Sequence, residues 1–270
     1  MSVSVALLQL EVSSSESPES RSARVLNMIP QAAASAQFLV LPELWHVGAH
    51  DLEAARTHAQ SIDGPLARQL SAAARAQGIW LHAGSIVERD AAGNLFNTSL
   101  LFAPNGDLAA SYRKMHLFGF DTGESALMSA GNELVQTETT LGRTGLTTCY
   151  DLRFPELFRA LCVQGVEAVV VTSGWPSARI EQWSVLLRAR AIENQCWVIA
   201  CNETGLQNSS DGPVQLGGCS AVINPLGEVV AQGGVEECLV FASVDMASVH
   251  ELRESFPVLR DIKLANNFKG

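Results

Sequence analysis

Cys149 is the residue of this sequence whose surroundings most favour covalent chemistry. It follows a strand-like segment, residues 141–148, and precedes a helix that we expect to begin at Pro155 and to end by Gly165. The unpaired amides and positive dipole end of a helix N-terminus favour a thiolate over a thiol. Many lone cysteines are simply small buried hydrophobic residues, so position alone leaves both a nucleophile and a core residue open.

Two charged residues stand at the ends of other strand-like segments. Glu43 follows the apolar run 38–41 and Pro42, beside bulky apolar neighbours, which would raise the pKa of its carboxyl toward the range of a general base. Lys114 follows the segment 108–113, and near Cys149 it would stabilise a thiolate and a developing oxyanion. Either residue could also be an ordinary charged group at a strand end.

Two further residues have an ordinary structural interpretation beside a functional one. Glu124 lies in a long glycine-containing stretch, residues 115–138, and by itself it is a plain loop carboxylate. Trp175 follows a strand end, where it either belongs to the core or forms the wall of a pocket. The six histidines and six cysteines lack the spacing of metal ligands, so no metal site is indicated.

The composition excludes several classes of partner. The net charge is −10, with no basic stripe for a nucleic acid or an anionic membrane, and no apolar run is long enough to span a bilayer. The cysteines are scattered through apolar segments and no signal peptide precedes them, which favours a cytoplasmic protein. Charged residues make up only 17%, which suggests a buried subunit interface and hence a homodimer or larger homo-oligomer.

The order of expected elements predicts an α/β fold. Two similar halves, each with strands followed by helices, suggest two sheets packed face to face with helices outside. No Pro/Ser-rich linker interrupts the chain, so we expect a single domain over residues 1–270. The polar, weakly patterned segment from about 246 to 270 is expected to be a C-terminal arm.

Three blocks of the sequence resemble the nitrilase superfamily of carbon–nitrogen hydrolases. They are Leu41-Pro42-Glu43, Tyr112-Arg113-Lys114-Met115-His116-Leu117-Phe118 and Cys149-Tyr150-Asp151-Leu152-Arg153-Phe154-Pro155-Glu156. Residues 188–195 and 224–228 resemble later blocks of the same family, so the similarity spans essentially the whole chain in order.

The resemblance implies a four-layer αββα sandwich that usually pairs into dimers. It implies a catalytic triad of Glu43, Lys114 and Cys149, with Glu124 as a second active-site glutamate. The backbone amide of Tyr150 would bind the oxyanion, and no cofactor is needed.

The block that begins at Cys149 is similar to the amidase branch, and residues 173–183 resemble the bacterial ω-amidases. The resemblance therefore implies a cysteine-dependent amidase that hydrolyses a small carboxamide, such as the ω-amide α-ketoglutaramate, to an acid and ammonia through a thioester. Other activities of the superfamily stay open: N-carbamoyl-amine hydrolase, deaminated-glutathione amidase and nitrilase. A catalytically silent binding protein on the same fold is the non-enzyme alternative.

Overall fold

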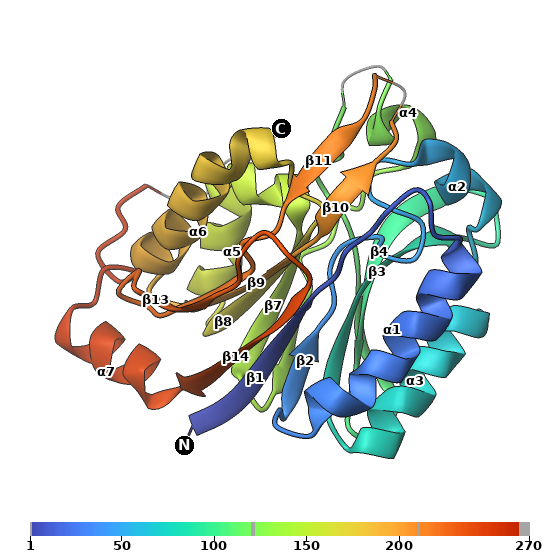
Figure 1. Cartoon of the computed structure of the whole chain (residues 1–270). Coiled ribbons are helices and arrows are strands. Elements are labelled where there is room, and N and C mark those ends of the chain that lie inside the picture. Colours follow the sequence, from blue (N-terminus) through green and yellow to red (C-terminus); the bar gives the residue numbers. More distant parts are fainter. Residues whose placement is uncertain (1, 120–121, 210, 265–270) are drawn as a thin grey trace.

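The computed structural model describes residues 2–119, 122–209 and 211–264. Two six-stranded sheets lie face to face, and helices cover the outer face of each sheet (Figure 1). The predicted α/β fold, a four-layer αββα sandwich in a single domain, is therefore confirmed.

The first sheet contains strands from both ends of the chain, in the order β14-β1-β2-β3-β4-β5. Its strands are β1 (Ser2–Gln9), β2 (Phe38–Val40), β3 (Trp80–Arg89), β4 (Leu95–Phe102), β5 (Leu108–Arg113) and β14 (Cys238–Asp245). The three strands β1, β2 and β3 run parallel, and the other pairings are antiparallel. Helices α1 (Pro18–Ala33) and α3 (Pro65–Gln77) cover it, each with proline at the helix start, where its missing amide costs no hydrogen bond.

The second sheet has the order β13-β12-β9-β8-β7-β6. Its strands are β6 (Gln136–Thr139), β7 (Gly142–Thr148), β8 (Ala168–Ser173), β9 (Trp197–Asn202), β12 (Ala221–Ile223) and β13 (Val229–Gln232). Because β7, β8 and β9 are parallel, each connection must cross over the sheet. Helices α5 (Pro155–Val163) and α6 (Ile180–Asn194) make these crossovers and cover the outer face.

Short elements complete the chain, and several lie beside the ends of the parallel strands. They are α2 (Leu52–Thr57), α4 (Glu124–Leu127), the 3-10 helices η1 (Cys149–Arg153) and η2 (Ser177–Arg179), the hairpin β10 (Thr204–Gln207) and β11 (Val214–Gly217), and α7 (Ala247–Ser255).

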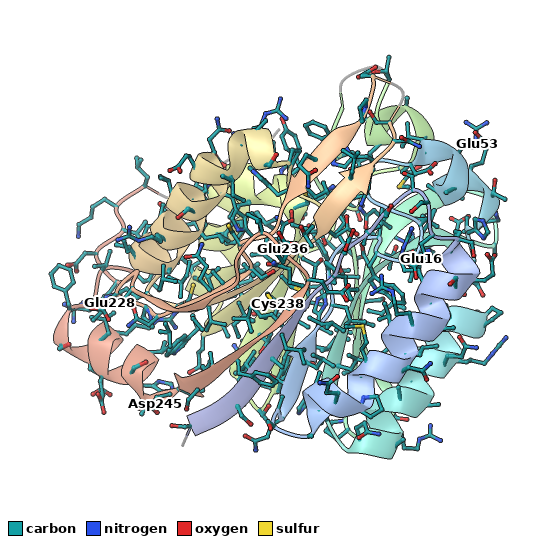
Figure 2. All side chains as sticks on the ribbon, in the orientation of Figure 1. Glu16, Glu53, Glu228, Glu236, Cys238 and Asp245 are labelled. Atoms are coloured by element: carbon teal, nitrogen blue, oxygen red, sulfur yellow. The ribbon has the colours of Figure 1, made fainter. Side chains whose placement is uncertain are left out.

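Apolar side chains fill the space between the layers. Strands β2 and β8 are buried along their whole length, because both of their faces are covered. Between the sheets, Val5 and Val40 of the first sheet share a cluster with Val170 and Ile199 of the second. Acidic residues such as Glu53, Glu228 and Asp245 lie at the periphery (Figure 2). None of the described helices is long and apolar enough to cross a membrane.

Part of the expected C-terminal arm packs on its own chain. Arg253 of α7 donates to the carbonyl oxygens of Val166 and Gln195, and Gln195 donates to that of Phe256. Residues 265–270 lie outside the described residues. The arm over 246–270 and the domain assignment 1–270 stay predictions.

Candidate active site

The C-terminal ends of parallel strands from both sheets border one cavity of about 740 Å³. Glu43 comes shortly after β2, Cys149 directly after β7 and Gly174 directly after β8. Loops at the carboxyl ends of parallel strands commonly form the ligand site of α/β proteins. The structure brings all the site residues predicted from sequence to this cavity: Glu43, Lys114, Glu124, Cys149, Tyr150 and Trp175.

The cavity floor, defined here as Glu43, Lys114, Glu124 and Cys149, is centred on the lysine. The Lys114 ammonium donates to Glu43 Oε1 at 2.8 Å and to Glu124 Oε2 at 2.7 Å. The lysine and both carboxyls are almost completely buried. An ammonium can donate a further hydrogen bond, and no other acceptor for Nζ is found within the described residues. One donor therefore remains for a substrate oxygen.

Asn97, on β4, lies behind the cavity floor, and sequence reasoning missed it. Its side-chain amide donates to Glu43 Oε1 at 2.8 Å and to Glu124 Oε1 at 2.6 Å. The backbone carbonyl oxygen of Asn97 accepts from the backbone amide of Lys114 at 2.8 Å. Asn97 therefore connects both carboxyls to strand β4, whose partner β5 leads directly into Lys114. The available signal was an asparagine within the fully buried strand β4, where its polar side chain needs partners.

Glu43 is held as an anion. Burial alone would raise the pKa of its carboxyl, but the charge of Lys114 and hydrogen bonds from Lys114, the Gly174 amide and the Cys149 thiol lower it below 4.5. The Gly174 amide donates to Oε2 at 2.9 Å. The expected rise in the pKa of Glu43 is therefore wrong, because the decisive partner, Lys114, is 71 residues away in sequence.

The second carboxyl is in a different electrostatic environment. Burial raises the pKa of Glu124, and the like charge of Glu43 adds to this rise, although Lys114 and the Phe118 amide oppose it. Burial would lower the pKa of Lys114, but its two carboxyl partners raise it well above 10.5. Lys114 thus stays protonated, and Glu43 is the carboxyl that presents negative charge to Cys149.

Cys149 occupies a strained turn. Its φ of 46° lies in the left-handed region, which costs a non-glycine residue about 1–2 kcal/mol. At the start of η1, Thr148 and Asp151 form a capping box. Asp151 also accepts hydrogen bonds from the Tyr112 hydroxyl at 2.7 Å and from the ring and amide of His116. These buried contacts hold the turn, so the surrounding structure imposes the strained conformation on the cysteine.

The surroundings of Cys149 favour the neutral thiol over the thiolate. Burial raises its pKa and the negative charge of Glu43 raises it further, although Lys114 and the Ser173 hydroxyl oppose the rise. The expectation that the helix N-terminus would favour a thiolate is therefore wrong, because burial and a nearby carboxylate outweigh the helix dipole. The resulting arrangement is a neutral thiol and an anionic carboxylate lining the same cavity, as in a nucleophile with its base.

Tyr150 and Trp175 flank this thiol. Tyr150 is the second residue of η1, and the first amides of a helix have no acceptor within the helix. Its amide is therefore suited to bind a developing oxyanion. Trp175 is buried, donates from its indole to the Arg179 carbonyl oxygen at 2.8 Å and lines the cavity.

The cavity wall, defined as His50, Phe118, Arg153, Trp175 and Arg179, carries positive charge. The Arg153 guanidinium lies 5.0 Å from the Trp175 ring centroid, and that of Arg179 lies 6.0 Å from the Phe118 ring centroid. In the part of the chain that the structure describes, neither guanidinium forms an ion pair with a carboxylate. The wall therefore presents cations that a substrate anion could neutralise.

Sequence reasoning did not identify His50, Phe118 or Arg179 as wall residues. They come from three separate segments, so no local pattern connects them. Across residues 2–119, 122–209 and 211–264, no group of three or more His, Cys, Asp or Glu residues is arranged to hold a metal ion.

Known proteins share this sequence pattern and fold. The model of the carbon-nitrogen hydrolase family matches residues 4–254. A 2-oxoglutaramate amidase of Paenarthrobacter nicotinovorans is 42% identical over 264 residues, which cover 95% of this chain and 88% of that protein. The human omega-amidase NIT2 is 34% identical over 264 residues, which cover 95% of this chain and 93% of that protein.

Solved structures lead to the same grouping. Nit3 of Saccharomyces cerevisiae, a member of branch 10 of the nitrilase superfamily, aligns with a TM-score of 0.84 and 28% identity. The alignment covers 95% of each chain.

Proposed function

Because the chain belongs to the carbon-nitrogen hydrolase family and is an amidase, we propose that it hydrolyses the ω-amide of a small dicarboxylic acid, such as α-ketoglutaramate. The observation that carries the proposal is that one cavity brings together the Cys149 thiol and the Glu43 carboxylate, which Lys114 holds in place at 2.8 Å.

The first half of the reaction forms a thioester. Glu43 takes the thiol proton while the Cys149 sulfur attacks the amide carbon, and the carbonyl oxygen becomes an oxyanion. The remaining donor of Lys114 and the Tyr150 amide stabilise this oxyanion; a single donor of this kind is typically worth about 2.7–4 kcal/mol. Glu43 then passes its proton to the amide nitrogen, so that the carbon–nitrogen bond breaks and ammonia leaves.

The second half of the reaction releases the acid. Glu43, again anionic, takes a proton from a water molecule that attacks the thioester carbon. The carbon–sulfur bond breaks, the sulfur recovers its proton and the carboxylic acid leaves. Glu124 holds Lys114 in position throughout, through its 2.7 Å contact.

Two observations support an anionic substrate. The relatives reported above are named for 2-oxoglutaramate and for ω-amides, whose far end carries a carboxylate. The wall residues Arg153 and Arg179 provide cations for such a group. Guanidinium groups bind carboxylates through paired hydrogen bonds.

A substrate panel tests the activity. We expect ammonia release from α-ketoglutaramate, and a thioester adduct of wild-type protein in mass spectra taken during turnover. Cys149→Ala should show neither. Retained turnover in this variant would refute the nucleophile assignment, and carbon dioxide release from carbamoyl amino acids or acid from nitriles would favour the other activities. Cys238→Ala is the matched control, because Cys238 lies on β14 and does not line the cavity.

We also propose that the protein is a cytoplasmic homodimer or larger homo-oligomer. Exposed apolar side chains on α5 and α6, namely Val163 at 46%, Val185 at 64% and Ile192 at 51%, support an interface on this layer. All six cysteines are free, as in proteins of reducing compartments. Light scattering at several concentrations measures the oligomer, and a monomer at all concentrations would contradict the proposal.

A further inference from the structure

Glu203 is a fully buried carboxyl that the proposed mechanism does not use. It directly follows β9, the parallel neighbour of β8, and so it lies beside the segment that carries Gly174. Its backbone amide donates to the Ser173 carbonyl oxygen at 3.0 Å. A Cβ atom added to Gly174 would lie 2.9 Å from Glu203 Oε2 and would also clash with Ala49. The Glu203 carboxyl and Ala49 thus enclose Gly174.

The surroundings of Glu203 do not suit a carboxylate. Oε2 accepts one hydrogen bond from the Gln207 side-chain amide at 2.8 Å, and Oε1 has no partner among the described residues. The charged groups that face it are Glu43, which repels a negative charge, and Arg21, whose own hydrogen bonds go elsewhere. Burial and the charge of Glu43 raise the pKa of Glu203 well above 4.5, although the Gln207 hydrogen bond, Arg21 and the Ala49 backbone amide oppose the rise.

Hydrogen bonds connect this acid to the amide that holds the base. Gln207 Oε1 accepts from the His50 backbone amide at 3.1 Å, and His50 Nε2 donates to the Gly174 carbonyl oxygen at 3.0 Å. The Gly174 amide in turn donates to Glu43 Oε2 at 2.9 Å. Glu203 therefore reaches Gly174 in two ways: through the hydrogen bonds of Gln207 and His50, and by packing directly against Gly174.

We propose that Glu203 is a positioning residue that works as a neutral carboxylic acid, orienting Glu43 through Gln207, His50 and Gly174. In its protonated form it packs against Gly174 without placing a second negative charge near Glu43. Loss of its proton would repel the Glu43 anion and loosen the buried peptide segment, so activity should fall as Glu203 ionises. This inference rests on the proposed role of Glu43 as the base.

Glu203→Gln tests the proposal, because glutamine has the shape of the neutral acid but cannot ionise. We expect its kcat to stay within about 2-fold of wild type, whereas Glu203→Ala should lose about 10- to 100-fold in kcat with little change in KM. The alkaline fall of kcat in the wild type should be absent in Glu203→Gln. Equal losses in both variants, or an unchanged alkaline limb, would overturn the proposal.

A stability measurement tests Glu203 without relying on activity. Because the pKa of Glu203 is raised in the folded state, the folded protein binds this proton more tightly than the unfolded chain does. The contribution of Glu203 to the free energy of unfolding should therefore fall as pH rises above 4.5. Glu203→Gln should remove that part of the fall and be at least as stable as wild type at neutral pH. An unchanged pH dependence of unfolding would refute a neutral Glu203, whatever the outcome for Cys149→Ala.

Glu88→Gln is the matched control for burial and charge. Glu88 is also a buried glutamate, but Arg113 donates to it at 2.5 and 2.9 Å and Thr98 at 2.6 Å. Loss of this charge should lower stability at neutral pH and leave the pH profile of kcat unchanged. If Glu88→Gln and Glu203→Gln change stability in the same direction, the proposed difference in ionisation is wrong.

Discussion

The cavity floor and the cavity wall hold their charges in different ways. On the floor, Lys114 and two carboxyls are almost completely buried and bonded to one another. On the wall, Arg153 and Arg179 are partly or largely exposed and face aromatic rings. Buried charges interact strongly and are fixed in place, whereas exposed charges are screened and free to meet a ligand. This difference suggests that the floor performs the chemistry and the wall selects the substrate.

Lys114→Met should have the largest effect of the variants that follow. It leaves two buried carboxyls without their cation, and losing one member of a buried ion pair typically costs about 3–5 kcal/mol. We expect this loss in the free energy of unfolding by urea, together with loss of ammonia release. Lys263→Met, at an exposed position, should stay within about 0.5 kcal/mol of wild type. Wild-type stability of Lys114→Met would show that the floor is not organised by this charge.

Glu43→Gln should keep the fold and lose the reaction. The amide retains the shape of the carboxyl but cannot accept the thiol proton, and removal of a general base typically costs about 10²- to 10⁴-fold in rate. In wild type the anion is present above its lowered pKa and is lost as pH falls through it, so the acid limb of kcat/KM should lie below pH 4.5. Circular dichroism at each pH checks that the protein stays folded. An acid limb above pH 4.5 would contradict the assigned ionisation.

Arg179→Gln should have the smallest effect, and on KM rather than kcat. We expect KM for α-ketoglutaramate to rise about 10-fold, equivalent to roughly 1.4 kcal/mol of binding, while a neutral amide of similar size is unaffected. Arg188→Gln serves as control, because Arg188 lies on α6, bonds to the Gly227 carbonyl oxygen and does not line the cavity. If KM changes equally for charged and neutral amides, the cavity wall does not select the substrate by its charge.

Three residues of the floor could be predicted because each stands at a recognisable strand end. Glu43, Lys114 and Cys149 all follow apolar or alternating segments that become strands. Asn97 could not be predicted in the same way, since its role depends on two carboxyls 27 and 54 residues away. Its sequence neighbours look the same as those of an asparagine with a purely structural role. Only its contacts with Glu43 and Glu124 in the folded protein distinguish it.

The ionisation states show a second limit. Local sequence suggested a raised pKa for Glu43 and a thiolate at Cys149, and both expectations were wrong. Burial, Lys114 and the mutual contact of the two groups decide both ionisation states. Glu203 is a similar case: it follows the apolar segment 196–202, but only the folded structure shows that its carboxyl is fully buried with one side-chain hydrogen-bond partner.

The sequence by itself determined the alternation of strands and helices and placed a cysteine, a glutamate and a lysine at strand ends, because side-chain periodicity and breaker residues act locally. Only the tertiary structure decided that β14 joins the first sheet beside β1, that Asn97 bridges two carboxyls and that Glu203 is shielded from water. Pairing, burial and charge interactions depend on distances between residues far apart in the chain, and these distances exist only after the two sheets have packed together.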